Sequence, residues 1–131
     1  MNQVMLDTSA YSAFMRARPQ AVAVVQAADR ICVNPVVLGE LTAGFLRGER
    51  LSENRRELLS FLSSPRAIVV DIDSDTAERY AVILASLLAA GTPIPTNDIW
   101  IAASAMQHGF RIVTADKHFR RISQVLVDLL E

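Results

Sequence analysis

The chain has 131 residues, and 51% of them are hydrophobic, which is enough to bury one core without disulfides or a structural metal. A formal net charge of -1 argues against a protein that holds nucleic acid through a general basic excess. The only cysteine, Cys32, cannot form an internal disulfide and indicates a reducing compartment. The N-terminus lacks a signal-peptide pattern, and the longest apolar run, Tyr80 to Ala90, is too short to cross a membrane. We therefore expect a cytoplasmic protein.

Strand and helix patterns alternate along the chain. Short apolar runs rich in β-branched residues predict strands, while Pro at first helical positions, Asp and Ser caps, and closing Gly residues predict helix boundaries. The predicted strands are Gln3–Leu6, Arg30–Asn34, Ala67–Ile72 and Arg111–Thr114, with Val125–Val127 as a possible fifth. The predicted helices are 9–16, 19–28, 35–46, 52–62, a long helix from the caps at 73–75 to residue 90, and 97–107.

This alternation is typical of βαβ units, in which parallel strands lie side by side and helices cover both faces of the sheet. We predict a three-layer α/β/α fold with a central, mainly parallel sheet of four to five strands. No repeat, low-complexity tract or linker interrupts the pattern. The prediction is therefore a single domain spanning residues 1–131.

Three acids stand where predicted strands end or predicted helices begin. Asp7 follows the first strand directly, Asp98 lies in the first turn of helix 97–107, and Asp116 follows the fourth strand by two residues. In open α/β sheets ligands bind just outside the carboxyl ends of the strands, so these acids are candidate site residues. The simpler alternative is that each one only caps a helix or favours its dipole.

Glu40 is harder to explain as a structural residue, because it lies in the middle of a predicted helix. Its neighbours one helical turn away are apolar residues or glycine, so we expect its carboxylate to be largely desolvated. A buried charge is costly unless a cation or a hydrogen-bond donor compensates it. Either a buried arginine pairs with Glu40, or Glu40 shares an acidic pocket with the other three acids.

A shared acidic pocket predicts a metal site. Clustered carboxylates repel one another and stay ionised together at neutral pH only if divalent cations neutralise them. Ligands that are all oxygen favour Mg²⁺ or Mn²⁺ over zinc. Local groups of basic residues, such as Arg55 with Arg56 and Arg120 with Arg121, suit either phosphate contacts or an ordinary solvated face.

Four stretches of the chain resemble, in their order, the signature blocks of PIN-domain ribonucleases and, among these, of VapC-type toxins from toxin-antitoxin pairs. The blocks are Asp7–Ala10, the embedded Glu40, Asn97–Ala103 and Ile112–Phe119. The resemblance implies a parallel α/β fold and a Mg²⁺-dependent endoribonuclease in which Mn²⁺ can substitute. It also implies an RNA substrate, dimerisation and inhibition by a cognate antitoxin.

The resemblance also assigns site residues. The catalytic and metal-binding acids are Asp7, Glu40, Asp98 and Asp116, and the substrate-contacting or supporting residues are Thr8, Ser9, Asn97, Thr114 and His118. His118 departs from the pattern, since many relatives carry an acid at that position. Because metal ions held by carboxylates already supply what phosphodiester hydrolysis needs, we expect His118 to pack or to contact substrate.

The alternative to an enzyme is a non-enzymatic module that binds RNA or a protein and whose acids only cap helices. Uptake of Mn²⁺ discriminates between the two. A mean hydropathy of +0.26 predicts apolar surface that partners cover. We expect a homodimer, together with an antitoxin segment lying across the helices that follow the first and second strands, and no membrane partner.

Overall fold

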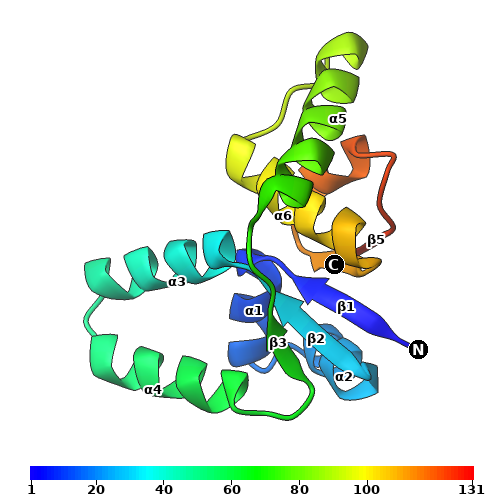
Figure 1. Ribbon diagram of the computed structural model, residues 1–131. Helices are drawn as coiled ribbons and strands as arrows, with labels where there is room; N and C mark the ends of the chain where they lie inside the picture. The colour runs from blue at the N-terminus through cyan, green and yellow to red at the C-terminus, as the bar shows by residue number, and fades with distance from the viewer.

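The central element of the fold is a parallel sheet of five strands, in a computed structural model that describes residues 1–131 (Figure 1). The strand order is β3-β2-β1-β4-β5, and every neighbouring pair is parallel. The strands are β1 (Gln3–Leu6), β2 (Arg30–Val33), β3 (Ala67–Val69), β4 (Arg111–Thr114) and β5 (Val127–Leu129). Helices flank this sheet, which confirms the predicted three-layer α/β/α fold.

The helices begin and end close to the predicted boundaries. They are α1 (Thr8–Met15), α2 (Pro19–Ala27), α3 (Pro35–Arg47), α4 (Leu51–Leu62), α5 (Ser74–Ala90) and α6 (Thr96–His108). Pro19 and Pro35 open α2 and α3, and Gly91 and Gly109 end α5 and α6 with positive φ angles of 69° and 74°. A short 3₁₀ helix, η1 (Lys117–Arg121), was not predicted.

Both edge strands differ from the prediction because their neighbours decide their length. The prediction that the third strand extends to Ile72 is wrong: β3 pairs only with Ile31 to Val33 of β2, and the chain of β2 then turns into α3. The fifth strand starts two residues later than predicted. Its residue Val127 pairs with Ile112, and Leu129 pairs with Thr114, so β4 sets the register.

The core lies on both faces of the two central strands. Val4, Met5 and Ile112 have no exposed surface, and Cys32 of β2 is completely buried, as its apolar surroundings predicted. No helix combines the length and the apolar character that a membrane-spanning segment needs. Because β1 is the middle strand with β4 beside it, the segments that follow these two strands emerge next to each other at the carboxyl-end edge of the sheet, where the parallel strands end.

Two helical pairs extend beyond this edge on opposite sides (Figure 1). The α3–α4 arm, a hairpin of these two helices, projects to one side, and α5 packs against α6 on the other side. Tyr80 of α5 stacks on Trp100 of α6 with ring centroids 4.1 Å apart, which fixes that pair. The carboxyl-end edge of the sheet therefore lies in the space between the α3–α4 arm and the N-terminus of α6.

Candidate active site

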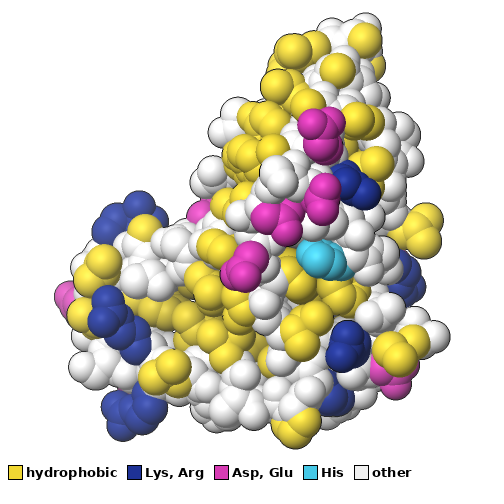
Figure 2. Space-filling view, in the orientation of Figure 1, with side chains coloured by type: hydrophobic (Ala, Val, Ile, Leu, Met, Phe, Trp, Pro, Cys, Tyr) yellow, Lys and Arg dark blue, Asp and Glu magenta, His cyan; other side chains and the backbone are white.

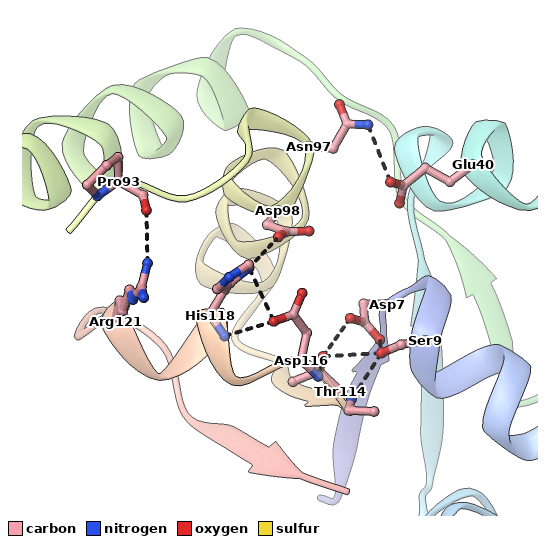
Figure 3. Close-up of polar contacts among 11 residues, drawn as sticks. Asp7, Ser9, Glu40, Pro93, Asn97, Asp98, Thr114, Asp116, His118 and Arg121 are labelled. Carbon is pink, nitrogen blue, oxygen red and sulfur yellow. Dashed lines mark hydrogen bonds and ion pairs between the residues drawn. The ribbon is translucent and has the colours of Figure 1, made fainter.

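The four candidate acids meet at this edge (Figure 3). Asp7 stands between β1 and α1, Glu40 projects from α3, Asp98 lies in the first turn of α6, and Asp116 precedes η1. Their side chains point toward a common space. In the space-filling view, acidic side chains gather with a histidine on this face of the molecule (Figure 2). The fold thus brings together residues from four separate segments of the chain.

Asp7 is the most deeply buried of the four acids, with 4% of its surface exposed. Its Oδ1 accepts hydrogen bonds from the Ser9 hydroxyl (2.7 Å) and the Ala10 backbone N–H (2.8 Å), and its Oδ2 accepts one from the Thr114 hydroxyl (2.6 Å). Burial raises the pKa of Asp7, although these hydrogen bonds oppose the effect. Asp7 is therefore both the N-cap of α1 and a carboxylate held in one orientation.

A chain of polar contacts links the ends of β1 and β4. The Ser9 hydroxyl accepts a hydrogen bond from the Ala115 backbone N–H (3.0 Å), and the Thr114 hydroxyl accepts one from the Asp116 backbone N–H (2.9 Å). Asp116 Oδ1 in turn accepts one from the His118 backbone N–H (2.9 Å). Ser9 and Thr114, two of the three predicted hydroxyl residues, therefore orient the loops that carry the acids, and Thr114 does so from a fully buried position.

Glu40 corrects one expectation: its carboxylate is half-buried, not largely desolvated. Only Val37 and Leu41 of α3 are buried, because the α3–α4 arm projects away from the sheet and leaves the rest of the helix open. Thr8 donates its hydroxyl to Glu40 Oε1 (2.7 Å), and the Asn97 amide donates to Oε2 (3.4 Å). The alternative of a buried arginine partner is wrong, since no ion pair involves Glu40.

Asp98 has the most unfavourable surroundings for a negative charge. Burial, followed by the negative charges of Asp116, Asp7 and Glu40, raises its pKa to about 6. Pro95 occupies the N-cap position of α6, where no side chain caps the helix, and the Asp98 carboxylate itself accepts no hydrogen bond. Helix capping therefore explains Asp7 and Asp116 as structural residues, but it does not explain Asp98 or Glu40.

The donor set at this edge fits a divalent cation. Asp98, Asp116 and His118 each offer a ligand atom, and these atoms lie within 4.8 Å of one another. No Lys or Arg forms an ion pair with any of the four acids. The acids thus repel one another without a compensating Lys or Arg, which is the condition that a bound metal relieves. This arrangement defines the class of the site, a carboxylate centre suited to metal-assisted hydrolysis.

The sequence pattern gave no functional role to Asn34, which helps to hold the site together. Asn34 is fully buried and caps α3 by accepting a hydrogen bond from the Val37 backbone N–H (3.1 Å). Its amide donates to the Ser104 hydroxyl (3.0 Å) and to the Trp100 carbonyl (3.3 Å) of α6. The residue thereby joins the helix of Glu40 to the helix of Asp98. The sequence analysis placed Asn34 at the end of a strand, with Pro35 opening the next helix, and nothing local indicated the contact with α6.

Known proteins are similar to this chain in sequence and in fold. The PIN domain family model matches residues 4–125. Ribonuclease VapC4 of Mycobacterium tuberculosis is 35% identical over 95 residues, which cover 72% of this chain and 73% of the relative. Ribonuclease VapC2 of Haemophilus influenzae is 30% identical over 125 residues, which cover 93% of each chain. The crystal structure of DNA-bound VapBC from Salmonella typhimurium matches with a TM-score of 0.84 and 27% identity, and covers 98% of both chains.

The chain therefore belongs to the PIN-domain family and, within it, to the VapC-type ribonucleases. It is accordingly a nuclease, a hydrolase of phosphodiester bonds. The family that the four sequence blocks indicated is confirmed.

Proposed function

We propose that this protein is a divalent-cation-dependent endoribonuclease that acts as the toxin of a toxin-antitoxin pair, with Mg²⁺ or Mn²⁺ as its metal. Residues 1–131 work as a single nuclease domain in the cytoplasm. The observation that carries the proposal is the convergence of Asp7, Glu40, Asp98 and Asp116 at one sheet edge without a Lys or Arg that pairs with them. The sequence relationship to VapC ribonucleases supports RNA as the substrate.

The four acids would hold the cation, and the polar side chains around them orient their carboxylates. A bound divalent cation supplies Lewis-acid stabilisation of the negative charge that grows on the phosphoryl oxygens during hydrolysis. Asp7 is held in one orientation by its three hydrogen bonds, so it reorganises little during the reaction. Thr8 and Asn97 orient the Glu40 carboxylate from two sides.

Basic residues on η1 are suited to hold the RNA backbone beside the acids. Lys117, Arg120 and Arg121 are exposed and follow Asp116 directly in the chain. The Arg121 guanidinium also donates to the Pro93 carbonyl (3.0 Å), which anchors it next to the start of α6 (Figure 3). Guanidinium groups bind phosphate through paired N–H donors, so this segment positions a phosphodiester for attack.

An antitoxin segment fits the groove between α1, α3 and α4. A cavity of about 390 Å³ there is lined in part by Leu41 and Phe45, and a more apolar cavity of about 380 Å³ beside α2 is lined in part by Phe14 and Phe61. Met15 borders both cavities, so one extended peptide can cover the two. The structurally similar Salmonella VapBC assembly supports such a partner.

A homodimer is the second proposed assembly. Val82 and Leu88 of α5 are 49% and 63% exposed, on a helix that projects from the body of the molecule. Hydrophobic side chains gather over this projecting part of the molecule in Figure 2, and contiguous exposed apolar patches are typical of an interface. Analytical ultracentrifugation at micromolar concentration should give the mass of a dimer, and a monodisperse monomer contradicts this part of the proposal.

The nuclease proposal is tested with purified protein freed of any bound inhibitor. It should cleave RNA internally when Mg²⁺ or Mn²⁺ is present, and a chelator should stop the reaction. Cleavage that persists in chelator contradicts the metal requirement. Mapping the ends of RNA fragments from cells that express the protein then identifies the target sequence.

A further inference from the structure

His118 contains a buried ring nitrogen whose surroundings are not those of a packing residue. The Nδ1 atom is shielded from solvent and has no hydrogen-bond partner, although 43% of the side chain is exposed. It lies 3.2 Å from Asp116 Oδ1 and 4.0 Å from Asp98 Oδ2 (Figure 3). A buried polar atom without a partner is uncommon in proteins and calls for a specific explanation.

Hydrogen bonding to Asp116 does not supply that explanation. Asp116 Oδ1 already accepts the His118 backbone N–H at 2.9 Å, and the ring Nδ1 makes no hydrogen bond to the same oxygen. In the neutral imidazole with its proton on Nε2, Nδ1 carries a free lone pair. His118 offers this lone pair to the same cluster as the carboxylates of Asp98 and Asp116. One ligand atom from each of the three side chains lies within 4.8 Å of the other two.

The spacing of these atoms suits shared ligation. Two ligand atoms that each lie about 2.1 Å from one cation can be at most about 4.2 Å apart. The two distances from Nδ1, 3.2 Å and 4.0 Å, fall within this limit. Asp116 and His118 also belong to one turn, in which the acid caps η1 and accepts the backbone N–H of the histidine. The turn therefore presents a carboxylate and an imidazole together.

We propose that His118 ligates, through Nδ1, the divalent cation that Asp98 and Asp116 hold, and that it makes the site favour transition cations such as Mn²⁺ over Mg²⁺. Imidazole is a better ligand for first-row transition metals than for Mg²⁺, which binds mainly oxygen and gives up its water reluctantly. This inference rests on the proposed metal-dependent function. It replaces the expectation, drawn from the sequence, that His118 only packs or contacts substrate.

The contrasting explanation is a protonated His118 that pairs with Asp116 and acts as a built-in positive charge. The two explanations differ in what Mn²⁺ does. A ligand nitrogen couples directly to the bound ion and strengthens its binding, whereas an imidazolium repels the ion, so that its removal strengthens binding.

Pulsed electron paramagnetic resonance of Mn²⁺-loaded protein labelled with ¹⁵N-histidine tests direct ligation. The chain has two histidines, and His108 lies at the far end of α6, so His108→Gln is a matched control. The wild type and His108→Gln should show the coupling of a directly bound ¹⁵N nucleus, and His118→Gln should lose it. A wild-type spectrum without nitrogen coupling overturns the inference.

Calorimetric titration of Mn²⁺ and Mg²⁺ tests the preference. His118→Gln should weaken Mn²⁺ binding at least about tenfold, because loss of even an outer-shell partner lowers metal affinity by about that factor or more. The same variant should change Mg²⁺ binding much less. His118→Asp should restore an oxygen ligand and shift the preference toward Mg²⁺. Circular dichroism in chelator checks that each variant is folded. Unchanged or tighter Mn²⁺ binding by His118→Gln overturns the inference in favour of the charge pair.

Nitrogen coupling, Mn²⁺ binding and RNA cleavage together separate a wrong role for His118 from a wrong metal-dependent function. If wild-type protein cleaves RNA with Mn²⁺ but shows no nitrogen coupling, only the role of His118 is wrong. If wild type and Asp98→Asn alike bind no Mn²⁺ and cleave nothing, the metal-dependent function itself is wrong, and the ligand role falls with it.

Discussion

Two aspartates at the starts of neighbouring helices have opposite environments. Asp73 is the N-cap of α5, and its Oδ1 accepts hydrogen bonds from the Thr76 backbone N–H and the Gln107 amide, both at 3.1 Å. These donors lower the pKa of Asp73. Asp98 lies in the first turn of α6, accepts no hydrogen bond, and has its pKa raised to about 6 by burial and by neighbouring acids.

The contrast separates a structural acid from a functional one. Local groups satisfy the charge of Asp73, so its helix explains it completely. Burial and three neighbouring acids oppose the charge of Asp98, His118 offsets them only in part, and a bound cation would relieve the rest. A residue that violates a local rule without internal compensation is typical of a functional site. Variants of the two regions, made in parallel, test whether this distinction holds.

The largest expected difference is in catalysis. Asp98→Asn should reduce RNA cleavage by more than about 100-fold, because even outer-shell partners of a metal contribute up to that much to metal affinity or activity. Asp73→Asn keeps a side chain that caps a helix nearly as well and should retain activity. Single-turnover cleavage with Mn²⁺ measures both. Equal activity of the two variants would remove Asp98 from the site.

Glu40→Gln should eliminate the stabilisation that a cation gives the folded protein. At a free Mn²⁺ concentration about 100 times the Kd, binding stabilises a native state by about 2.7 kcal/mol, so the wild-type Tm should rise with Mn²⁺ and fall back with chelator. Glu40→Gln should fold normally and lose most of that rise. Glu49→Gln, at an exposed position after α3, is the matched control. A Mn²⁺ response in Glu40→Gln equal to that of wild type contradicts the assignment.

The acid cluster around Asp98 and the start of α5 each also contain a fully buried threonine whose hydroxyl donates to an aspartate. Thr114 donates to Asp7 and accepts from the Asp116 backbone, and Thr76 donates to Asp73. Thr114→Val should destabilise the protein by about 1 to 3 kcal/mol, since it leaves the buried Asp7 Oδ2 without its donor. Thr76→Val should also lower the Tm. Only Thr114→Val should reduce the rate of cleavage per folded molecule, and equal rates in both variants would show that the Thr114 hydroxyl is only structural.

Local patterns in the sequence predicted most of the fold but only part of the site. Asp7, Asp98 and Asp116 could be found because strand ends and helix starts are visible in the sequence, and parallel strands bring such positions to one edge. The exposure of Glu40 could not be predicted, because the direction in which the α3–α4 arm leaves the sheet depends on tertiary packing. The contact of Asn34 with α6 joins residues 70 positions apart, beyond the reach of any local pattern.

The smallest expected effect is the pH dependence of stability without metal. The folded pKa of Asp98, about 6, is above its ordinary value of 3.8, so the native state binds this proton more tightly than the unfolded state. Above pH 6 the ionised Asp98 therefore lowers the free energy of unfolding. This destabilisation shrinks as the pH falls from 6 to 3.8 and is absent below 3.8. Asp73, with a lowered pKa, contributes stability that is present above 3.8 and is lost as the pH falls further.

Thermal melts in chelator between pH 7 and pH 5 test whether Asp98 and Asp73 contribute to stability in these opposite ways. Wild type and Asp73→Asn should gain stability as the pH falls through 6, because protonation of Asp98 removes a repulsive charge from the acid cluster. Asp98→Asn has no such charge, so its Tm should change less over this range and should exceed that of wild type at pH 7. An Asp98→Asn variant with the same pH profile as wild type would show that the acids do not repel one another, and that the two aspartates differ less than their surroundings indicate.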